Sequence, residues 1–354
     1  MKKGGVLSTF FHVYPIDDTD KNTAVLYSQE GEGFLIKGAF YGVALKRRVE
    51  LDLKECVELG IRIYRHRDRS DFNIQRFLVF LVRAFANNQE IKNLHLFFRQ
   101  NSDLKEIEKE NAIFYEQLTR HIFYHKSTLQ ERLTLIKQHF MFCLDIFKKD
   151  ALQKIYYDQR LILWKTYYKN ELFTIGIDFK YVDRKEGLMS IELQLAEKRI
   201  YHITFWFCQD ENQQPILKIG ALQGIYNGAE MIHDLTKCFF GYRPKNLILY
   251  ALRLFAQELK IQTIYAVSNA GFFTNTHVRV DRKLKSSLDT FWLEAGGEMT
   301  EDLRFFKVPL IERRKEIEDV KSQKRNLYRK RYKLLDEIKD GFKENIYQYI
   351  KQQE

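Results

Sequence analysis

The spacing of apolar residues divides the chain into a helical first half and a strand-rich second half. From Phe72 to about Asp150, apolar residues recur three and four positions apart, which is typical of amphipathic helices. Ser127, followed three residues later by Gln130, is close to a capping box and predicts where the last of these helices begins. The predicted helices are FNIQRFLVFLVRAFANN, DLKEIEKENAIFYEQLTRHIFY and TLQERLTLIKQHFMFCLDIF.

Past about residue 170 the pattern changes to short runs of alternating or β-branched residues. The segments DRKEG, EKR and ENQQP have turn compositions and separate these runs. We therefore expect an antiparallel meander. Its four predicted strands are LFTIGIDFKYV, GLMSIELQLA, RIYHITFWFCQD and PILKIGALQG.

The elements that follow predict a change of strand direction. After a short helical stretch, a long helix that starts beyond Gly241 joins the fourth strand to another strand, TIYAVSN. Such a crossover places its two strands parallel, within a sheet that is otherwise antiparallel. The start of the helix then faces the cleft at the ends of this strand pair. A helix in SSLDTFWLEA, one bent or two short strands in GEMTEDLRFFKVPL and a charged helical tail complete the pattern.

The predicted fold class is α+β, with a helical N-terminal region followed by a mixed β-sheet flanked by helices. Hydrophobic residues make up 45% of the chain and there are only four prolines, so a packed body is expected rather than domains on flexible linkers. We expect four parts. They are an extension of short elements with a strand in GEGFLIKGAFYGVAL (1–75), a helical region (76–165), an α/β domain (166–312) and a basic helix packed on the body (313–354).

A formal net charge of +11 predicts attraction to an anionic partner. Nucleic acid, an anionic lipid or lipopolysaccharide surface and a phosphorylated substrate all fit, and a general enrichment in lysine would give the same total. The four cysteines are widely separated, which favours a reducing compartment. There is no apolar run of about 18 residues and no signal-peptide pattern. We therefore expect a cytoplasmic protein, or one at the periphery of the inner membrane.

Two cations stand where the long helix begins, although a helix N-terminus favours acids. Arg243, Lys245 and Asn246, with the free backbone N–H groups, predict a phosphate site to which Gly241 would allow close approach. In the alternative reading, Pro244 only marks the first helical position and the cations reach solvent. The predicted ligand-binding residues are Gly224, Thr236, Lys237, Gly241, Arg243, Lys245 and Asn246.

The candidate reactive groups lie at or beyond the ends of the parallel strands. Gln223 could orient a carbonyl, Ser268 and Asn269 could donate to an oxyanion, and His277 is the candidate general base. Each has a plainer reading. Gln223 would be a structural hydrogen-bonding residue, Ser268 and Asn269 would cap the loop, and His277 would be incidental.

The tail segment KSQKRNLYRKRYK holds seven cations and no acid. Arg325, Arg329 and Arg331 are therefore predicted contacts for an anionic ligand or surface, at about 1 kcal/mol per cation beside an anionic leaflet. RNA binding with tyrosine stacking is a further possibility. The apolar positions of the segment favour packing on the body, and we rank a nucleic-acid role below the others.

The order of elements resembles the GNAT acetyltransferase architecture. Gln223 and Gly224 end the fourth strand, VSN ends the next one, and Trp292 and Gly296 have the aromatic-x-x-x-glycine spacing of that superfamily. The resemblance implies that acyl-CoA is the cofactor, with its pyrophosphate at the start of the long helix. One feature departs from it. The compact Q/R-x-x-G-x-G/A loop is replaced by an inserted helix and the basic segment GYRPKN.

Several ordered motifs between about residues 110 and 340 resemble the VirK/YbjX-like family of Gram-negative bacteria. They are ERLTLIKQHFMFCL, RKEGLMSIELQL, IGALQG, DLTKCFFGYRPKNLI, AVSN, FWLEAGG, FKVPL and KRNLYRKRYKLL. This resemblance implies links to virulence, to resistance against cationic antimicrobial peptides and to lipopolysaccharide and the envelope.

Together these features predict acyl-CoA-dependent transfer to an amine or hydroxyl of an envelope component, with an anionic small-molecule or lipid-linked substrate. The alternative is a non-catalytic factor that binds anions or a membrane surface, so the sequence leaves open whether the protein is an enzyme.

Overall fold

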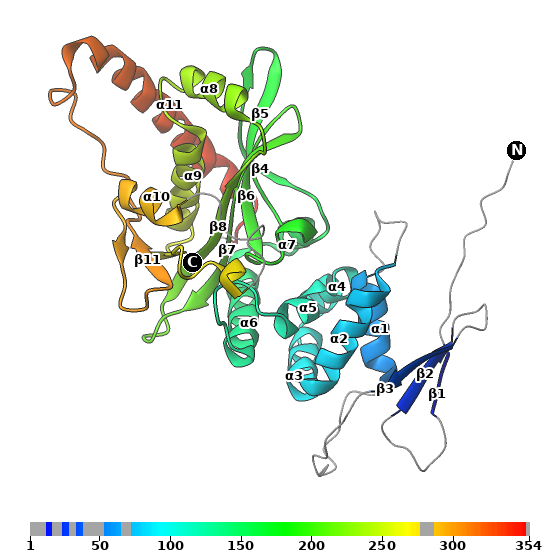
Figure 1. Cartoon of the computed structure of the whole chain (residues 1–354). Helices are drawn as coiled ribbons and strands as arrows, with labels where there is room; N and C mark the ends of the chain where they lie inside the picture. The colour runs from blue at the N-terminus through cyan, green and yellow to red at the C-terminus, as the bar shows by residue number, and fades with distance from the viewer. Residues whose placement is uncertain are drawn as a thin grey trace, which may run out of the picture. The chain divides into compact units, whose positions relative to one another are not determined.

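Figure 1 shows a computed structural model of the chain, which divides into two compact units, Met1–Glu50 and Leu51–Glu354. The structure describes the backbone of three strands in the first unit, and residues 53–64, 72–276 and 287–351 in the second. The three strands form an antiparallel sheet in the order β1–β2–β3 (His12–Pro15, Thr23–Tyr27, Gly33–Lys37). Strand β3 falls within the segment GEGFLIKGAFYGVAL, as predicted.

The described part of the second unit opens with seven helices. They are α1 Leu53–Tyr64, α2 Ile74–Ala86, α3 Asn88–Arg99, α4 Ser102–Glu110, α5 Ile113–Thr119, α6 Leu129–Ile146 and α7 Lys149–Tyr156. The helix predicted over 103–124 is in fact two helices, α4 and α5. Asn111 interrupts it with an extended backbone, and its side chain accepts a hydrogen bond from the N–H of Ile113.

The predicted start of α6 is one residue too early. Thr128 is the N-cap residue and forms a full capping box with Glu131. Ser127 instead donates its hydroxyl to the carbonyl of Ile122, 2.7 Å away. The T-x-x-E pattern was present in the sequence and identifies the cap better than the neighbouring serine and glutamine.

A mixed sheet of eight strands follows, in the order β10-β11-β9-β8-β7-β6-β5-β4. Only β8 and β9 run parallel among these strands, as the crossover predicts. The meander has one strand more than predicted, because LILWKTYY forms β4. The strands are β4 Leu161–Tyr168, β5 Glu171–Asp178, β6 Met189–Leu195, β7 Lys198–Gln209, β8 Pro215–Gly224, β9 Thr263–Val267, β10 Glu298–Met299 and β11 Phe305–Val308.

Helices flank this sheet, so the predicted α+β class is confirmed. Helix α9 packs against β6 and β7, α11 packs against β4 and α9, and α6 packs against β7 (Figure 1). The remaining elements of this region are η1 Tyr181–Asp183, α8 Ala229–Cys238, α9 Pro244–Glu258, η2 Phe273–Thr276, α10 Leu288–Glu294 and α11 Ser322–Ile346.

The two faces of the central strands have different chemistry, which follows from the register. One face, called here the apolar face, packs on α9, where the Phe205 and Phe255 rings lie 5.7 Å apart. Its buried side chains are Phe173, Ile175, Ile177, Ile191, Leu193, Ile203, Phe205 and Leu222. The opposite face, called the polar face, is equally buried but carries Thr174, Asp178, Ser190, Glu192, His202 and Thr204.

Helix α11 and the residues after it cover the outer edge of β4. Asn345 donates to the carbonyl of Leu163 at 3.1 Å, and the Tyr349 hydroxyl donates to that of Ile162 at 3.3 Å. Leu163 lies at a β-bulge, where the register between β4 and β5 shifts. Polar side chains thus take the place of a further strand at this edge.

Candidate functional site

The two cations that the sequence singles out lie between the start of α9 and α10. Arg243 is the N-cap residue of α9 but makes no side-chain capping bond, and its Nη1 atom lies 3.9 Å from Glu294 Oε2. Lys245 Nζ lies 4.1 Å from the centre of the Phe291 ring. Burial lowers the pKa of Lys245. A basic group on a partly buried helix start is the arrangement that an anion would stabilise.

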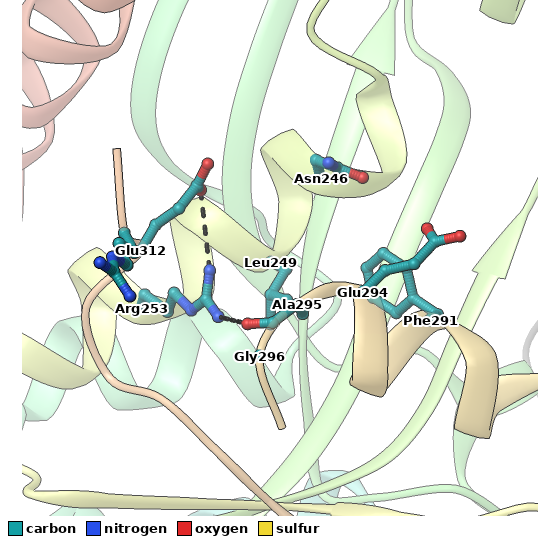
Figure 2. Close-up of a pocket in the computed structure, with 9 residues that line it drawn as sticks. Asn246, Leu249, Arg253, Phe291, Glu294, Ala295, Gly296 and Glu312 are labelled. Carbon is teal, nitrogen blue, oxygen red and sulfur yellow. Dashed lines mark hydrogen bonds and ion pairs between the residues drawn. The ribbon is translucent and has the colours of Figure 1, made fainter. Parts of the chain in front are cut away.

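A pocket of about 210 Å³ lies beside these cations, between α9, α10 and the segment after β11. Figure 2 shows Asn246 and Arg253 on α9, with Glu294 opposite on α10. Arg253 is fixed because it donates to the carbonyls of Pro309 and Ala295, at 2.8 and 3.0 Å. The pocket is lined by Asn246, Leu249, Arg253, Phe291, Glu294, Ala295, Gly296, Glu312 and Arg313.

The turn that leads into α9 is held by the chain itself. Phe240 and Gly241 both have left-handed backbones, with φ of 53° and 76°, which end α8. Arg331 of α11 donates from Nε and Nη2 to the carbonyl of Phe240, at 3.1 and 2.9 Å. A Cβ atom at Gly241 would lie 2.9 Å from Arg331. Arg331 therefore occupies the space that a side chain at position 241 would need.

The other predicted residues near this turn differ in exposure and bonding. Thr236 donates its hydroxyl to the carbonyl of Ile232 at 2.6 Å, and Lys237 is exposed. Of the tail cations, Arg325 donates to the carbonyls of Val320 and Glu318, both at 3.0 Å. Arg329 is exposed, whereas Arg331 is held in the turn. The three tail arginines are therefore not equivalent.

Strands β8 and β9 separate before β8 ends. Their parallel pairing runs only from Ile216–Thr263 to Ile219–Ala266, while β8 continues to Gly224. The register with β7 shifts at the same place, because Gly220 is an extra residue in β8. Beyond this bulge, one edge of β8 has no partner strand within the described residues. The segment ends in Gln223 and Gly224, both exposed.

The polar residues that end β9 stabilise its loop. Ser268 donates to the carbonyl of Leu303 and accepts from the N–H of Gly271, at 2.6 and 2.9 Å. Asn269 accepts from the N–H of Leu288 at 2.7 Å and so organises the start of α10. The residues described by the structure do not include His277, so the predicted general base lies outside them.

At the end of β9, a tryptophan side chain bonds the backbone carbonyl that points toward β8. The N–H of Ser268 donates to the carbonyl of Arg304, the residue before β11, at 2.8 Å. Since the two polar groups of one peptide point in opposite directions, the carbonyl of Val267 points toward β8. There it accepts a hydrogen bond from Nε1 of the buried Trp292, at 2.8 Å. Where β8 and β9 separate, the backbone edge that is left without a partner strand among the described residues is therefore that of β8.

Under the end of β8, the polar face holds a carboxylate and an imidazole with unused polar atoms. Gln223 donates from Nε2 to Glu186 Oε1 at 2.5 Å. Glu186 Oε2 and His202 Nε2 are buried without hydrogen-bond partners and lie 4.0 Å apart. Asp183 Oδ1 lies 3.4 Å from the same His202 atom. These four residues are called the Glu186 cluster below.

Burial shifts the proton affinities of this cluster in opposite directions. It raises the pKa of Glu186 to about 8, with a further contribution from the negative charge of Asp183. It lowers the pKa of His202 to about 4. Both groups are thus held mainly neutral near pH 7. Perturbed, buried titratable groups of this kind are concentrated at functional sites.

Next to the cluster, a network of ion pairs covers the rest of the polar face. Glu192 is fully buried and accepts from Lys180 Nζ and Arg199 Nη1, both at 2.8 Å. Arg199 also binds Asp183. Burial, followed by the charge of Glu192, raises the pKa of Asp178, whose carboxylate lies 3.4 Å from Lys180. The cations of this network are therefore already matched by acids.

The N-terminal helices hold the segment that carries Glu186. Gln117 of α5 donates to the carbonyls of Arg184 and Gly187, at 2.7 and 3.0 Å. Glu116, also on α5, pairs with Arg184 at 3.0 Å. At Gly220 the fit is closer still, because an added Cβ would lie 1.7 Å from the carbonyl oxygen of Glu186. The bulge in β8 thus fixes where the Glu186 backbone lies.

Comparison with known proteins places the chain in a family. The family described as "Protein of unknown function (DUF535)" matches residues 69–344. The chain is a DUF535 protein. The matched region includes the Glu186 cluster, the bulge and the start of α9.

Three relatives of this DUF535 protein carry related sequences. An "Uncharacterized protein" of Haemophilus influenzae is 26% identical over 211 residues, which are 59% of this chain and 69% of the relative. The "Uncharacterized protein YbjX" of Escherichia coli is 33% identical over 173 residues, 48% of this chain and 52% of the relative. A second Haemophilus influenzae protein is 26% identical over 170 residues.

The alignments thus span about half the length of the latter two curated relatives. The resemblance to the VirK/YbjX-like family is confirmed. No solved structure matches the chain, so its likeness to the GNAT architecture stays a prediction.

Sequence reasoning did not single out the acids and the imidazole of the Glu186 cluster in this DUF535 chain. Glu186 lies in DRKEG, which reads as a turn, and His202 lies in a strand with no recognisable motif around it. A charged residue at an inward position of an otherwise apolar strand, as in SIELQL and YHITF, is the available signal. Such residues are worth examining even where no motif surrounds them.

The described residues contain neither a metal-binding cluster nor a membrane-spanning helix. No group of three or more His, Cys, Asp or Glu residues is arranged there to hold a metal ion. Within the same described ranges, no helix is both long and apolar enough to cross a bilayer.

Proposed function

We propose that this DUF535 protein transfers an acyl group from acyl-CoA to an amine or hydroxyl of a cell-envelope component. One observation carries the proposal. The parallel pair β8–β9 separates after four residue pairs, and the free edge of β8 ends at Gln223 above the buried Glu186. A free strand edge can align the two amides of a pantetheine arm through backbone hydrogen bonds. A titratable group at its end could then take part in proton transfer.

The cationic start of α9 supports an anionic donor. Arg243 and Lys245 flank the first turn of a helix of 15 residues, and the pocket between α9 and α10 begins beside them. The phosphates of a CoA thioester would be stabilised by these charges and by the positive end of the helix dipole. Glu312 on the pocket wall, 3.6 Å from Arg253, disfavours an anion deeper inside. The phosphates are therefore assigned to the Arg243 end.

The test of the donor is a ligand-dependent thermal shift. Coenzyme A, acetyl-CoA and a long-chain acyl-CoA should each raise the melting temperature, since ligand at 100 times its Kd adds about 2.7 kcal/mol. The Arg243→Ala/Lys245→Ala variant should lose the shift. Arg99→Ala, which removes an exposed arginine from α3, should keep it. The absence of a shift with all three compounds would overturn the assignment of the donor.

The exposed cations of α11 favour a second candidate function, non-catalytic binding to an anionic membrane surface. Arg329, Lys330 and Lys333 all face solvent. Co-sedimentation with phosphatidylglycerol vesicles should then fall when these three are changed to alanine, and it should weaken as salt is raised. If membrane binding is the whole function, the variant loses vesicle binding and the wild-type protein shows no thermal shift with any CoA thioester.

A further inference from the structure

We propose that the Glu186 cluster binds a primary ammonium group, so that the acceptor in the transfer reaction is an amine. This inference rests on the proposed function for the identity of the reaction, but the binding site itself does not depend on the donor. The ligand's charged group would lie among Glu186 Oε2, His202 Nε2 and Asp183 Oδ1.

The arrangement of acceptor atoms matches the donors of an ammonium group. His202 Nε2 lies 4.0 Å from Glu186 Oε2 and 3.4 Å from Asp183 Oδ1. Consider a nitrogen atom placed about 2 Å from the midpoint between His202 Nε2 and Glu186 Oε2, at right angles to the line that joins them. It is about 2.8 Å from both atoms, which is hydrogen-bond distance. An ammonium group has three N–H donors, and a neutral imidazole protonated on Nδ1 offers Nε2 as an acceptor. A hydroxyl has one donor and would leave acceptors unsatisfied.

The two unpartnered atoms are the evidence that a ligand belongs here. Glu186 and His202 are 8% and 5% exposed, so both are more than nine-tenths buried. A buried polar atom without a hydrogen bond destabilises the folded protein, because it has lost its water partner and gained none. The two unpartnered atoms lie 4.0 Å apart, so one donor-rich group could satisfy both.

A bound ammonium group would change the charge state of Glu186. Within the described residues, no lysine or arginine forms an ion pair with Glu186, and His202 Nε2 lies 4.0 Å from its Oε2 atom. Arg199 is already matched by Asp183 and Glu192. A bound ammonium group would therefore supply the counter-charge that Glu186 lacks and would favour its ionised form.

The same geometry gives a balanced transfer step. The ammonium loses one proton to the Glu186 carboxylate, and the free amine nitrogen attacks the thioester carbonyl carbon. A nitrogen–carbon bond forms and the carbon–sulfur bond breaks, which yields an amide and a thiolate. The nitrogen loses its second proton as the amide forms. One of the two protons completes the thiol of CoA, and the other is released to solvent.

Access to the site passes Gln223, the exposed member of the cluster. Its amide donates to Glu186 Oε1 and covers the carboxylate from the solvent side. It also lies at the end of the free edge of β8, which is the edge assigned to the donor. The acceptor amine, bound at Glu186, and the thioester, aligned along β8, would then meet beside Gln223.

The test uses n-butylammonium as the probe and n-butanol as its uncharged counterpart. Binding is followed by the ring-proton NMR signals of His202, assigned through His202→Asn, and by thermal shift. We expect n-butylammonium to shift the His202 signals at pH 7.5, and n-butanol to leave them unchanged. Glu186→Gln should weaken this binding at least tenfold. Glu230→Gln, the same change at an exposed glutamate of α8, should bind as the wild type does.

The outcomes separate the two proposals. Equal binding of both probes, or unchanged affinity in Glu186→Gln, overturns the ammonium site even if CoA binds. Butylammonium binding without any CoA thermal shift supports the ammonium site and overturns the donor instead. If Glu186→Gln does not fold, Asp183→Asn is measured in its place, and undiminished binding in that variant overturns the inference.

Discussion

The two faces of the central sheet are equally buried, yet they serve different purposes. On the apolar face, Phe205 packs against Phe255 of α9 among other buried apolar side chains. On the polar face, Glu192 and His202 are buried at comparable exposure beside ion pairs. Apolar burial stabilises a fold directly, at about 25 cal/mol per Å². Buried ion pairs only offset their own desolvation, and often incompletely.

Stability alone therefore does not explain why the polar face carries buried charged residues. Replacing the polar face by well-packed hydrocarbons would be neutral or stabilising in many proteins. Here it would also remove Glu186, which has an unused acceptor atom. The proposed ammonium site at the end of β8 would account for the polar face, while the apolar face and α9 provide the stability that it requires.

Breaking the apolar face should have the largest effect. Phe205→Ala removes a fully buried ring from between the sheet and α9. We expect a loss of about 3 to 5 kcal/mol in the free energy of unfolding. Urea denaturation measures it, and Phe205→Leu is the milder control. A loss below 1 kcal/mol for the alanine variant would show that α9 does not depend on this contact.

Breaking the ion network of the polar face should cost somewhat less. Glu192→Gln leaves Lys180 and Arg199 without their shared carboxylate. Because these side chains are still 30% and 27% exposed, water can partly replace it, and we expect a loss of about 3 kcal/mol. Urea denaturation is again the measurement. A stabilised Glu192→Gln variant would contradict the view that Glu192 holds these cations in place.

Moving the Glu186 backbone should affect ligand binding more than folding. Gly220→Ala would place a methyl group on the Glu186 carbonyl, so this segment must shift. We expect a loss of about 2 to 3 kcal/mol in stability and no detectable n-butylammonium binding. The comparison variant is Gly297→Ala. An added Cβ there would lie 2.9 Å from the carbonyl oxygen of Trp292, but the position is far from Glu186 in the sequence. Undisturbed butylammonium binding in Gly220→Ala would be inconsistent with the proposed geometry.

The smallest expected effect is a pH dependence that separates Glu186 from its neighbours. Its pKa is raised to about 8 in the folded state, so above the usual carboxyl pKa the native protein holds a proton that the unfolded chain has lost. Stability contributed by Glu186 therefore falls as pH rises toward 8. His202, with its pKa lowered to about 4, acts in the opposite direction, but only between about pH 4 and 6.5.

From pH 6.5 to 8, the wild-type protein should thus lose roughly 1 to 2 kcal/mol more than Glu186→Gln. The other titratable groups that act on Glu186, which are Asp183, Lys185 and Arg199, are present in both proteins, so their contributions largely cancel in the difference. Thermal melts across this range provide the measurement. Parallel curves for the two proteins would mean that Glu186 does not hold its proton in the folded state.

Local patterns predicted much of the fold because they report on short-range physics. The crossover from β8 to β9 follows from strand, helix and strand in order, and the parallel pairing confirms it. Strand β4 was missed because LILWKTYY lacks clear alternation, and its place depends on contacts with α11 more than 180 residues away. The break at Asn111 was missed for a similar reason. The surrounding spacing is helical, and one side chain decides the interruption.

The candidate site was predictable only at its cationic side. Arg243 and Lys245 contradict helix electrostatics locally, so the sequence alone draws attention to them. The buried pair required the register, because His202 meets Gln223 across β7 and β8 and Glu186 arrives from another segment. The sequence also could not show that Arg331 is held by the Phe240 carbonyl, which sets it apart from the exposed Arg329.

The cover that α11 gives to β4 also has a consequence during synthesis. Strand β4 leaves the ribosome more than 180 residues before Asn345 and Tyr349, whose side chains satisfy its outer carbonyls. At about 5 to 20 residues per second, that interval lasts on the order of 10 to 35 seconds. During this time the nascent sheet has an open edge, so a chaperone or a neighbouring nascent chain would meet it first at β4. Completion of the last helix is then the step that ends this exposure.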